Sequence, residues 1–147
     1  MGKKVINKSC HTIALDTNIF IYHFEENKRF LNKTTEIFSD IEKGKCRGVS
    51  SIISLVEILT LPKRKNDYIL VRDYNEILLN FPNLKFIDVN WEIADWSSSI
   101  RAKYNITTPD SIQIATAICH KAEYFLTADK NFKKIKDIKV KLLQESR

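Results

Sequence analysis

Short apolar runs alternate along the chain with longer segments in which apolar residues recur every three or four positions. A short apolar run bounded by polar residues is typical of a buried strand, and a longer segment with one apolar stripe is typical of an amphipathic helix. The pattern predicts strands at residues 12–15, 47–51, 84–89, 124–127 and 140–143.

Helical periodicity fills the intervals between these expected strands. The stripes over residues 67–81 and 91–104 include Ile69, Ile77 and Trp96, which we expect to face the core. The expected helices are residues 19–24, 30–41, 52–61, 67–81, 91–104 and 109–122, with Pro62 ending the third and a short helix near Asn131.

This order of elements predicts an α/β fold. Strands that are separated by helices pair in parallel, because the chain must cross over the sheet between them. We therefore expect a three-layer α/β/α sandwich with a central, mostly parallel sheet. In such sheets functional groups gather at the carboxyl ends of the strands, beside the switch in strand order.

Length and composition limit the class of protein. A chain of 147 residues is the size of one domain, so residues 1–147 are expected to form a single unit. With 44% hydrophobic residues, 3 Gly and 3 Pro, disordered and collagen-like classes are excluded. No apolar stretch approaches the roughly 18 residues of a membrane span, and Asp16 interrupts the first apolar run, so neither a membrane segment nor a secretory signal is expected. The expected location is the cytoplasm.

The cysteines and the net charge add little by themselves. The chain has three cysteines, an odd number, and none of them forms a C-x-x-C pair; they are Cys10, Cys46 and Cys119. This argues against a disulfide framework or a zinc site and favours small buried thiols. The net charge of +6 and the pI of about 9.2 suggest a polyanionic partner, but a soluble protein that is merely basic would have the same values.

Four acidic residues stand where expected strands end or helices begin. Asp16 follows the first strand and Asp129 the fourth, and each could simply be a helix N-cap. Glu57 could complete a capping box that begins at Ser54. Asp110 could complement the helix dipole behind an N-cap at Thr108 and a proline at the first helical position.

The four acids are more informative as a set. In the predicted sheet Asp16, Glu57 and Asp129 emerge along one edge, and Asp110 can lean toward them. Glu57 stands among apolar neighbours in the sequence, where a carboxylate is costly unless it is paired or binds a metal. Converging carboxylates repel, so a cation would be needed to keep them ionised. An oxygen-only ligand set favours Mg²⁺ or Mn²⁺ over zinc.

Four sequence segments carry a family resemblance. In chain order they are Ala14-Leu15-Asp16-Thr17-Asn18, Ser51-x-x-Ser54-x-x-Glu57, Pro109-Asp110 with Ala115-Thr116-Ala117, and Leu126-Thr127-x-Asp129-x-x-Phe132. The chain resembles PIN-domain nucleases, most closely the toxin subunits of bacterial and archaeal toxin–antitoxin pairs, from about residue 12 to 143. It departs from the usual pattern at Gln113, where the family commonly has isoleucine.

The resemblance implies a metal-dependent endoribonuclease that hydrolyses RNA phosphodiester bonds and leaves a 5′-phosphate and a 3′-hydroxyl. It implies that Thr17, Asn18 and Thr127 support the site, that the protein forms a homodimer, and that a small antitoxin packs over the active site. The implied catalytic and metal-binding residues are Asp16, Glu57, Asp110 and Asp129.

Basic and aromatic residues are candidates for RNA contacts. Lys130, Lys133 and Lys134 closely follow Asp129, and Arg101 is a further candidate for holding phosphates, although a solvated face explains these residues equally well. Three aromatic residues could stack on bases, but their helical spacing places them first in the core or an interface: Tyr22, Trp91 and Trp96.

Two other functions stay open from the sequence. One is a catalytically silent RNA-binding module in this fold. The other is a doubly wound phosphotransfer domain in which Asp16 accepts the phosphoryl group, since an aspartate at the end of the first strand can have that role.

Overall fold

The computed structural model describes residues 11–144, so Cys10 lies outside the described residues. A five-stranded sheet in the order β3-β2-β1-β4-β5 forms the centre, and every neighbouring pair is parallel. The predicted strands are confirmed, although β3 ends two residues earlier than expected. The strands are β1 (Thr12–Leu15), β2 (Arg47–Ser51), β3 (Leu84–Ile87), β4 (Tyr124–Thr127) and β5 (Val140–Leu142).

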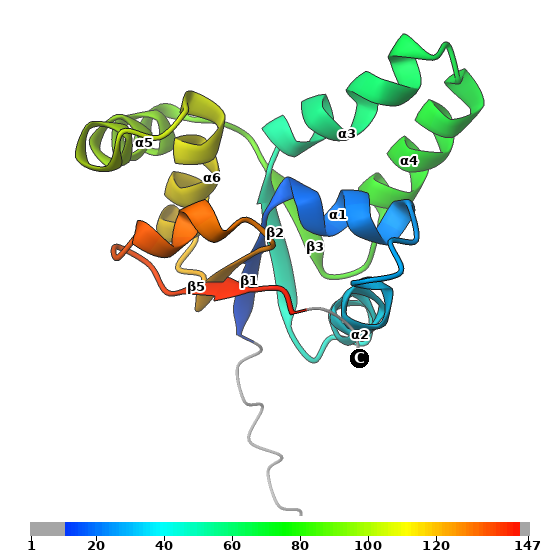
Figure 1. Cartoon of the computed structure of the whole chain (residues 1–147), viewed down its shortest axis with the longest axis horizontal. Helices are drawn as coiled ribbons and strands as arrows, with labels where there is room; N and C mark the ends of the chain where they lie inside the picture. The colour runs from blue at the N-terminus through cyan, green and yellow to red at the C-terminus, as the bar shows by residue number, and fades with distance from the viewer. Residues whose placement is uncertain (1–10, 145–147) are drawn as a thin grey trace, which may run out of the picture.

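Helices cover both faces of this sheet (Figure 1). The first four lie on one side, and the last two pack together on the other, so the three-layer α/β/α prediction is confirmed. The helices are α1 (Thr17–Phe24), α2 (Leu31–Glu42), α3 (Ile53–Arg64), α4 (Tyr68–Asn80), α5 (Trp91–Tyr104) and α6 (Thr108–Cys119), and a 3₁₀ turn, η1 (Lys130–Lys134), follows β4.

Successive strand residues feed two separate cores. In β1, Ile13 and Leu15 belong to the core under α1 to α4, whereas Ala14 belongs to the core under α5 and α6. In β4, Leu126 likewise belongs to the core under α1 to α4, and Phe125 to the core under α5 and α6. Because both faces are buried, these strands are apolar at nearly every position, which is the pattern of central parallel strands.

Two details of the helices differ from expectation. The prediction that Pro62 ends its helix is wrong, because α3 continues through the buried Pro62 to Arg64. A proline removes its own N–H donor and its ring crowds the carbonyl four residues earlier, and α3 ends two residues after Pro62. Trp96, expected in the core or an interface, is 41% exposed and lies outside the core; the buried residues of α5 are Ile93, Ser97 and Ile100.

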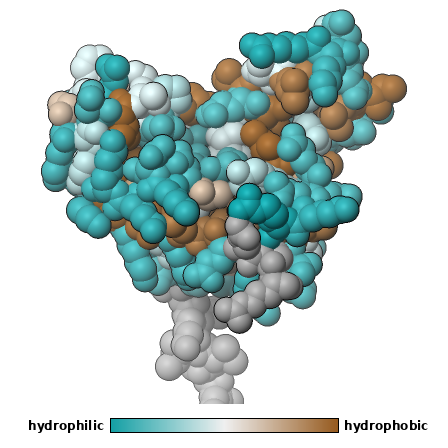
Figure 2. Space-filling view, in the orientation of Figure 1, coloured by the Kyte–Doolittle hydropathy of each residue, from teal (hydrophilic) through white to brown (hydrophobic). Residues whose placement is uncertain are grey.

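Helices α3 and α4 form a hairpin that extends beyond the sheet (Figure 1). The apolar stripe predicted for α4 faces the core only in part: Leu78 is buried, and Val71, Tyr74 and Phe81 are partly buried against the core. Ile69 and Ile77 are 68% and 45% exposed, as is Leu79 outside the stripe, at 77%. Brown, apolar surface gathers over this hairpin in Figure 2. No helix within residues 11–144 has the length and apolar character needed to cross a membrane.

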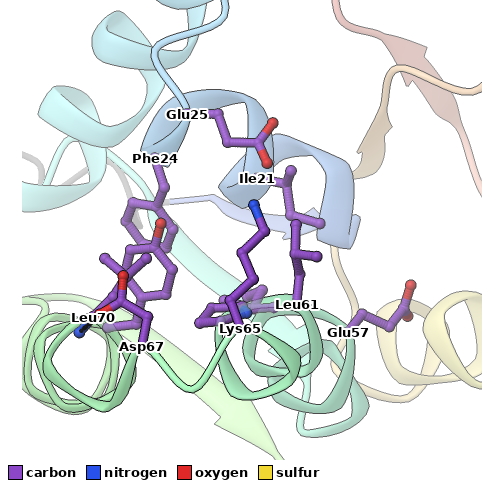
Figure 3. A pocket seen from close by; sticks show the side chains of 11 residues that line it. Ile21, Phe24, Glu25, Glu57, Leu61, Lys65, Asp67 and Leu70 are labelled. Carbon is purple, nitrogen blue, oxygen red and sulfur yellow. Dashed lines mark hydrogen bonds between the residues drawn. The ribbon is translucent and has the colours of Figure 1, made fainter.

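A pocket of about 280 Å³ lies between this hairpin and α1. Figure 3 shows Ile21 and Phe24 of α1 facing Leu61 of α3 and Leu70 of α4 across it. The pocket is therefore largely apolar. Three charged side chains also line it, Glu25, Lys65 and Asp67, and Glu57 stands at one end.

Strand β2 pairs with one edge of β1, and β4, which comes later in the chain, pairs with the opposite edge of β1. The change in strand order therefore falls between β1 and β4. In doubly wound sheets the crevice at the carboxyl ends of such strands is the usual place for ligands. Asp16 directly follows β1, and Asp129 lies two residues after β4.

Candidate active site

Asp16 is held rigidly at the junction of β1 and α1. It is the N-cap of α1, and its Oδ1 accepts the Thr17 backbone N–H at 2.8 Å. Its Oδ2 accepts the Thr127 hydroxyl at 2.7 Å and the Asn18 side-chain amide at 3.1 Å. The side chain is only 7% exposed. The cap expected from the sequence is thus present, and three hydrogen bonds fix the carboxylate that provides it.

Burial raises the pKa of Asp16 to about 6. The hydrogen bonds from Thr127 and Thr17 oppose this shift, and the nearby carboxylates of Asp110 and Glu57 add to it. A carboxyl group with this pKa is partly protonated just below neutral pH. A cation placed beside it would favour the ionised form and remove the repulsion.

The end of β4 is tied to the end of β1 through Thr127 and Asn18. The Thr127 hydroxyl accepts the Asp129 backbone N–H at 3.0 Å while it donates to Asp16. The Asn18 side-chain oxygen accepts the Ala128 N–H at 3.2 Å. Asp129 is the N-cap of η1, as one sequence interpretation had it, and accepts the Asn131 N–H at 2.9 Å.

Asp110 enters the site from the first turn of α6. The expected N-cap at Thr108 is wrong by one residue, since Thr107 has the extended N-cap conformation and its hydroxyl accepts the Asp110 N–H at 3.3 Å. Partial burial raises the pKa of the half-buried Asp110 carboxyl, and the charge of Asp129 raises it further.

Glu57 reaches the site from α3. The capping box with Ser54 is wrong, because the N-cap of α3 is Ile52 and Ser54 lies buried in the first turn. Glu57 is exposed rather than enclosed by its apolar sequence neighbours, since a helix points adjacent residues in different directions. Its Oε1 accepts the Thr17 hydroxyl at 3.2 Å. Partial desolvation raises the pKa of Glu57, and Asp110 adds to the shift.

The four acids therefore form one electrostatic group. Asp16 interacts with Asp110 and Glu57, Glu57 with Asp110, and Asp110 with Asp129. Within residues 11–144 no three His, Cys, Asp or Glu side chains stand close enough to enclose an ion in their present rotamers. Carboxylate oxygens alone suit Mg²⁺ or Mn²⁺. The pKa values of Asp16, Glu57 and Asp110 are raised mainly by burial, and the neighbouring carboxylates add repulsion that a cation would relieve.

A buried polar cluster lies beneath these acids and was not expected from the sequence. The Gln113 side-chain amide donates to Ser54 at 2.8 Å and to Thr17 at 3.2 Å. Ser50 contacts Ser54 at 2.9 Å and donates to the Leu15 carbonyl at 2.8 Å. The departure from the usual family pattern at Gln113 was the only available signal, since α6 also buries the polar Ser111 and Thr116.

The basic candidates surround the site less closely. Lys130, Lys133 and Lys134 are exposed on η1, directly after Asp129. Arg101 is exposed near the end of α5, where its Nε donates to the Ile106 carbonyl at 3.2 Å.

The aromatic candidates differ among themselves. Tyr22 is half-buried and stacks on Phe30 with ring centroids 4.8 Å apart. Trp91 is 91% exposed on α5, so of the two places expected for it, core or interface, the core is excluded.

Sequence comparison identifies the family of this site. The family model of the PIN domain matches residues 13–138. The chain belongs to the PIN domain family. The expected resemblance is thereby confirmed, and the four carboxylates lie within or at the ends of the elements that the match covers. Membership also removes the phosphotransfer interpretation of Asp16.

Relatives of this PIN domain include an archaeal protein and several bacterial structures. Ribonuclease VapC6 from Methanocaldococcus jannaschii is 33% identical over 70 residues, which cover 48% of this chain and 46% of that protein. The match thus spans about half the length of the relative.

The structural neighbours of this PIN domain match more of the chain. VapBC2 from Rickettsia felis, bound to a DNA fragment from its promoter, has a TM-score of 0.74 at 18% identity and covers 89% of this chain and 98% of the matched chain. DNA-bound VapBC from Salmonella typhimurium has a TM-score of 0.70 at 19% identity, and the match covers 90% of this chain and 98% of the matched chain. At these identities the likeness establishes the fold.

Proposed function

We propose that this PIN domain is a divalent-metal-dependent endoribonuclease and the toxin of a toxin–antitoxin pair. The observation that carries the proposal is the convergence of four carboxylates at the switch in strand order, around an Asp16 fixed by three hydrogen bonds. The name of the M. jannaschii relative and the titles of the VapBC structures support it. We also propose that residues 1–147 act as one nuclease domain in the cytoplasm.

The residues of the chain would have distinct tasks in this reaction. Asp16 offers a preoriented carboxylate, while Asp110 and Glu57 add oxygens from α6 and α3 and Asp129 adds one beyond β4. A Mg²⁺ or Mn²⁺ ion held there would offset their charge and supply an activated water for in-line attack on the RNA phosphorus. Thr127, Thr17 and Asn18 keep the carboxylates turned toward the site.

Incubation of purified protein with labelled single-stranded RNA tests this proposal. We expect cleavage with Mg²⁺ or Mn²⁺, none in excess chelator, and recovery when the metal is restored. Products should carry a 5′-phosphate and a 3′-hydroxyl. Binding without cleavage under every metal condition would instead identify a silent RNA-binding module.

We expect the lysines of η1 to hold the phosphates beside the cut. Lys133 and Lys134 are exposed, while their neighbours Phe132 and Ile135 are buried, so replacing both lysines by alanine should leave the fold intact. Each lost phosphate contact on single-stranded RNA should reduce the slope of log affinity against log salt by about 0.7. Binding titrations in chelator at several salt concentrations would measure this loss.

A matched pair of lysines provides the control for that experiment. Lys43 follows α2 and Lys85 lies in the edge strand β3, and both are exposed and outside η1. Their double replacement by alanine removes the same charge and should leave the salt slope nearly unchanged. Equal losses from both pairs would mean that net charge alone, rather than the η1 lysines, attracts RNA.

We propose that the pocket between α1, α3 and α4 receives an apolar segment of the antitoxin. Its lining is mostly apolar, its rim carries charges of both signs, and Glu57 stands at one end, so an occupant would also approach the carboxylates. The exposed apolar residues of the hairpin, Leu61, Ile69 and Leu79, extend this surface.

Co-expression with a short reading frame of antitoxin type, where one is found immediately upstream of the gene, tests the partner. Leu61 lines the pocket and is 48% exposed, so replacement by glutamate should place a charge in the interface without disturbing the core. We expect the wild type to co-purify with the small protein and Leu61→Glu to lose it, while Lys85→Glu retains it. The homodimer implied by the resemblance stays a prediction, and the mass of the purified protein in solution tests it.

A further inference from the structure

Gln113 occupies a buried place under the candidate active site, three residues after Asp110 on α6. It is 2% exposed, and its side-chain amide donates to the hydroxyls of Ser54 and Thr17. Thr17 in turn donates to Glu57 at 3.2 Å. A continuous chain of hydrogen bonds therefore leads from α6 through the start of α1 to the exposed carboxylate on α3.

The direction of these hydrogen bonds follows from the number of protons available. A serine or threonine hydroxyl has one proton to donate and two lone pairs to accept with. Ser50 donates to the Leu15 carbonyl, so in its contact with Ser54 it must accept. The single proton of Ser54 is thereby used, and Ser54 can act only as an acceptor toward Gln113 and Thr17.

Thr17 consequently has two competing acceptors for its one proton. Ser54 lies at 2.9 Å and the Glu57 carboxylate at 3.2 Å. The Gln113 amide fills one lone pair of Ser54 at 2.8 Å and also donates to Thr17. Gln113 thus leaves Ser54 only one lone pair with which to compete, and the charged Glu57 carboxylate is the stronger acceptor for the Thr17 proton.

We propose that Gln113 is a positioning residue that directs the Thr17 hydroxyl toward Glu57 and so holds this carboxylate in place for a divalent cation. The inference rests on the proposed function, since it assumes that Glu57 helps to hold the metal. It assigns a role to the one position where the chain departs from the usual family pattern in the α6 segment.

Replacement of Gln113 by methionine tests the role, because methionine has a similar shape and no N–H. Binding of Mn²⁺ to the protein, followed without RNA by electron paramagnetic resonance, is the primary measurement. Loss of a side chain that orients a metal ligand typically lowers metal affinity 10–100-fold. We expect Gln113→Met to lower Mn²⁺ affinity on the order of 10-fold, and RNA cleavage to recover at raised Mn²⁺, which a loss of folded protein would not allow.

Thr116→Val is the matched control on the same helix. Thr116 is also buried, but its hydroxyl donates to the Ile112 carbonyl within α6 and takes no part in the cluster. This variant loses a buried polar group of similar cost and should bind Mn²⁺ as the wild type does. Should Gln113→Met fail to fold, Gln113→Asn keeps the amide but shortens its reach, and we expect it to weaken Mn²⁺ binding as well.

A double variant tests the route through Thr17. If Gln113 acts through this hydroxyl, Gln113→Met should cost little further Mn²⁺ affinity in a Thr17→Val background. Fully additive losses, or equal Mn²⁺ affinity in Gln113→Met and the wild type, would overturn the inference while leaving the proposed function intact. A wild-type protein that binds no Mn²⁺ and cleaves no RNA would overturn both.

Discussion

Replacement of Asp16 by asparagine is expected to lower the rate of RNA cleavage more than about 100-fold, beyond the range seen when only a supporting residue of a metal site is lost. Asparagine is as good an N-cap as aspartate, so α1 should keep its cap. What the variant lacks is the negative charge that interacts with the carboxylates of Asp110 and Glu57. The initial rate on labelled RNA at saturating Mn²⁺ measures the effect.

Asp110→Asn should have a comparable effect, because its carboxylate links Asp16 and Glu57 to Asp129. Asp40→Asn is the control. Asp40 lies on α2, away from the site, and its Oδ1 is 3.7 Å from the Nζ of Lys45. That variant should cleave RNA at the wild-type rate. Undiminished cleavage by Asp16→Asn would mean that Asp16 is only a helix cap.

The metal-free protein should lose stability as the pH rises toward neutrality. The pKa of Asp16 is raised from 3.8 to about 6 in the folded protein, so between these values the folded state binds more protons than the unfolded state. The free energy of unfolding therefore falls with rising pH across this window. For Asp16 the loss is about 2 kcal/mol between pH 4.5 and pH 7, as follows from 1.36 kcal/mol per pKa unit.

Urea unfolding in chelator at the two pH values measures this loss. The difference between the wild type and Asp16→Asn isolates the contribution of Asp16 from other titrating groups, and we expect the variant to show the smaller fall. At pH 7, Mn²⁺ at 100 times its dissociation constant should then raise the wild-type free energy of unfolding by about 2.7 kcal/mol. An equal rise in Asp16→Asn would place the ion elsewhere.

The fold was largely predictable because its physical signals are local. Ile13, Leu15 and Leu126 occur in short apolar runs, and the helices between these runs force parallel pairing. The positions of Asp16 and Asp129 followed from the same reasoning, since they lie one and two residues after strands that proved to be neighbours.

Details that depend on side-chain direction were less predictable. The exposure of Glu57 and Trp91 depends on how far α3 and α5 turn from the sheet, which apolar periodicity alone does not fix. The choice of Thr107 over Thr108 as N-cap depends on backbone dihedral angles. The partners of Gln113 lie 96 and 59 residues away in sequence, so no local pattern could reveal them.

The charge of the chain takes on a clearer meaning in this structure. The net charge is +6, although four acids are concentrated at one end of the β1–β4 crevice. The remaining surface is correspondingly more basic, and the exposed lysines of η1 lie directly beyond Asp129. A basic surface attracts RNA, whereas the acidic group repels a phosphate until a cation is bound.

One titration tests most directly whether the four carboxylates form a metal-dependent ribonuclease site. Mn²⁺ is added to the wild-type protein, and its binding and the rate of RNA cleavage are followed in the same samples, with Asp110→Asn in parallel. We predict that cleavage rises with Mn²⁺ occupancy at the same midpoint, and that the variant binds Mn²⁺ weakly and does not cleave. Cleavage that persists in excess chelator, or Mn²⁺ binding unchanged in Asp110→Asn, would contradict this account.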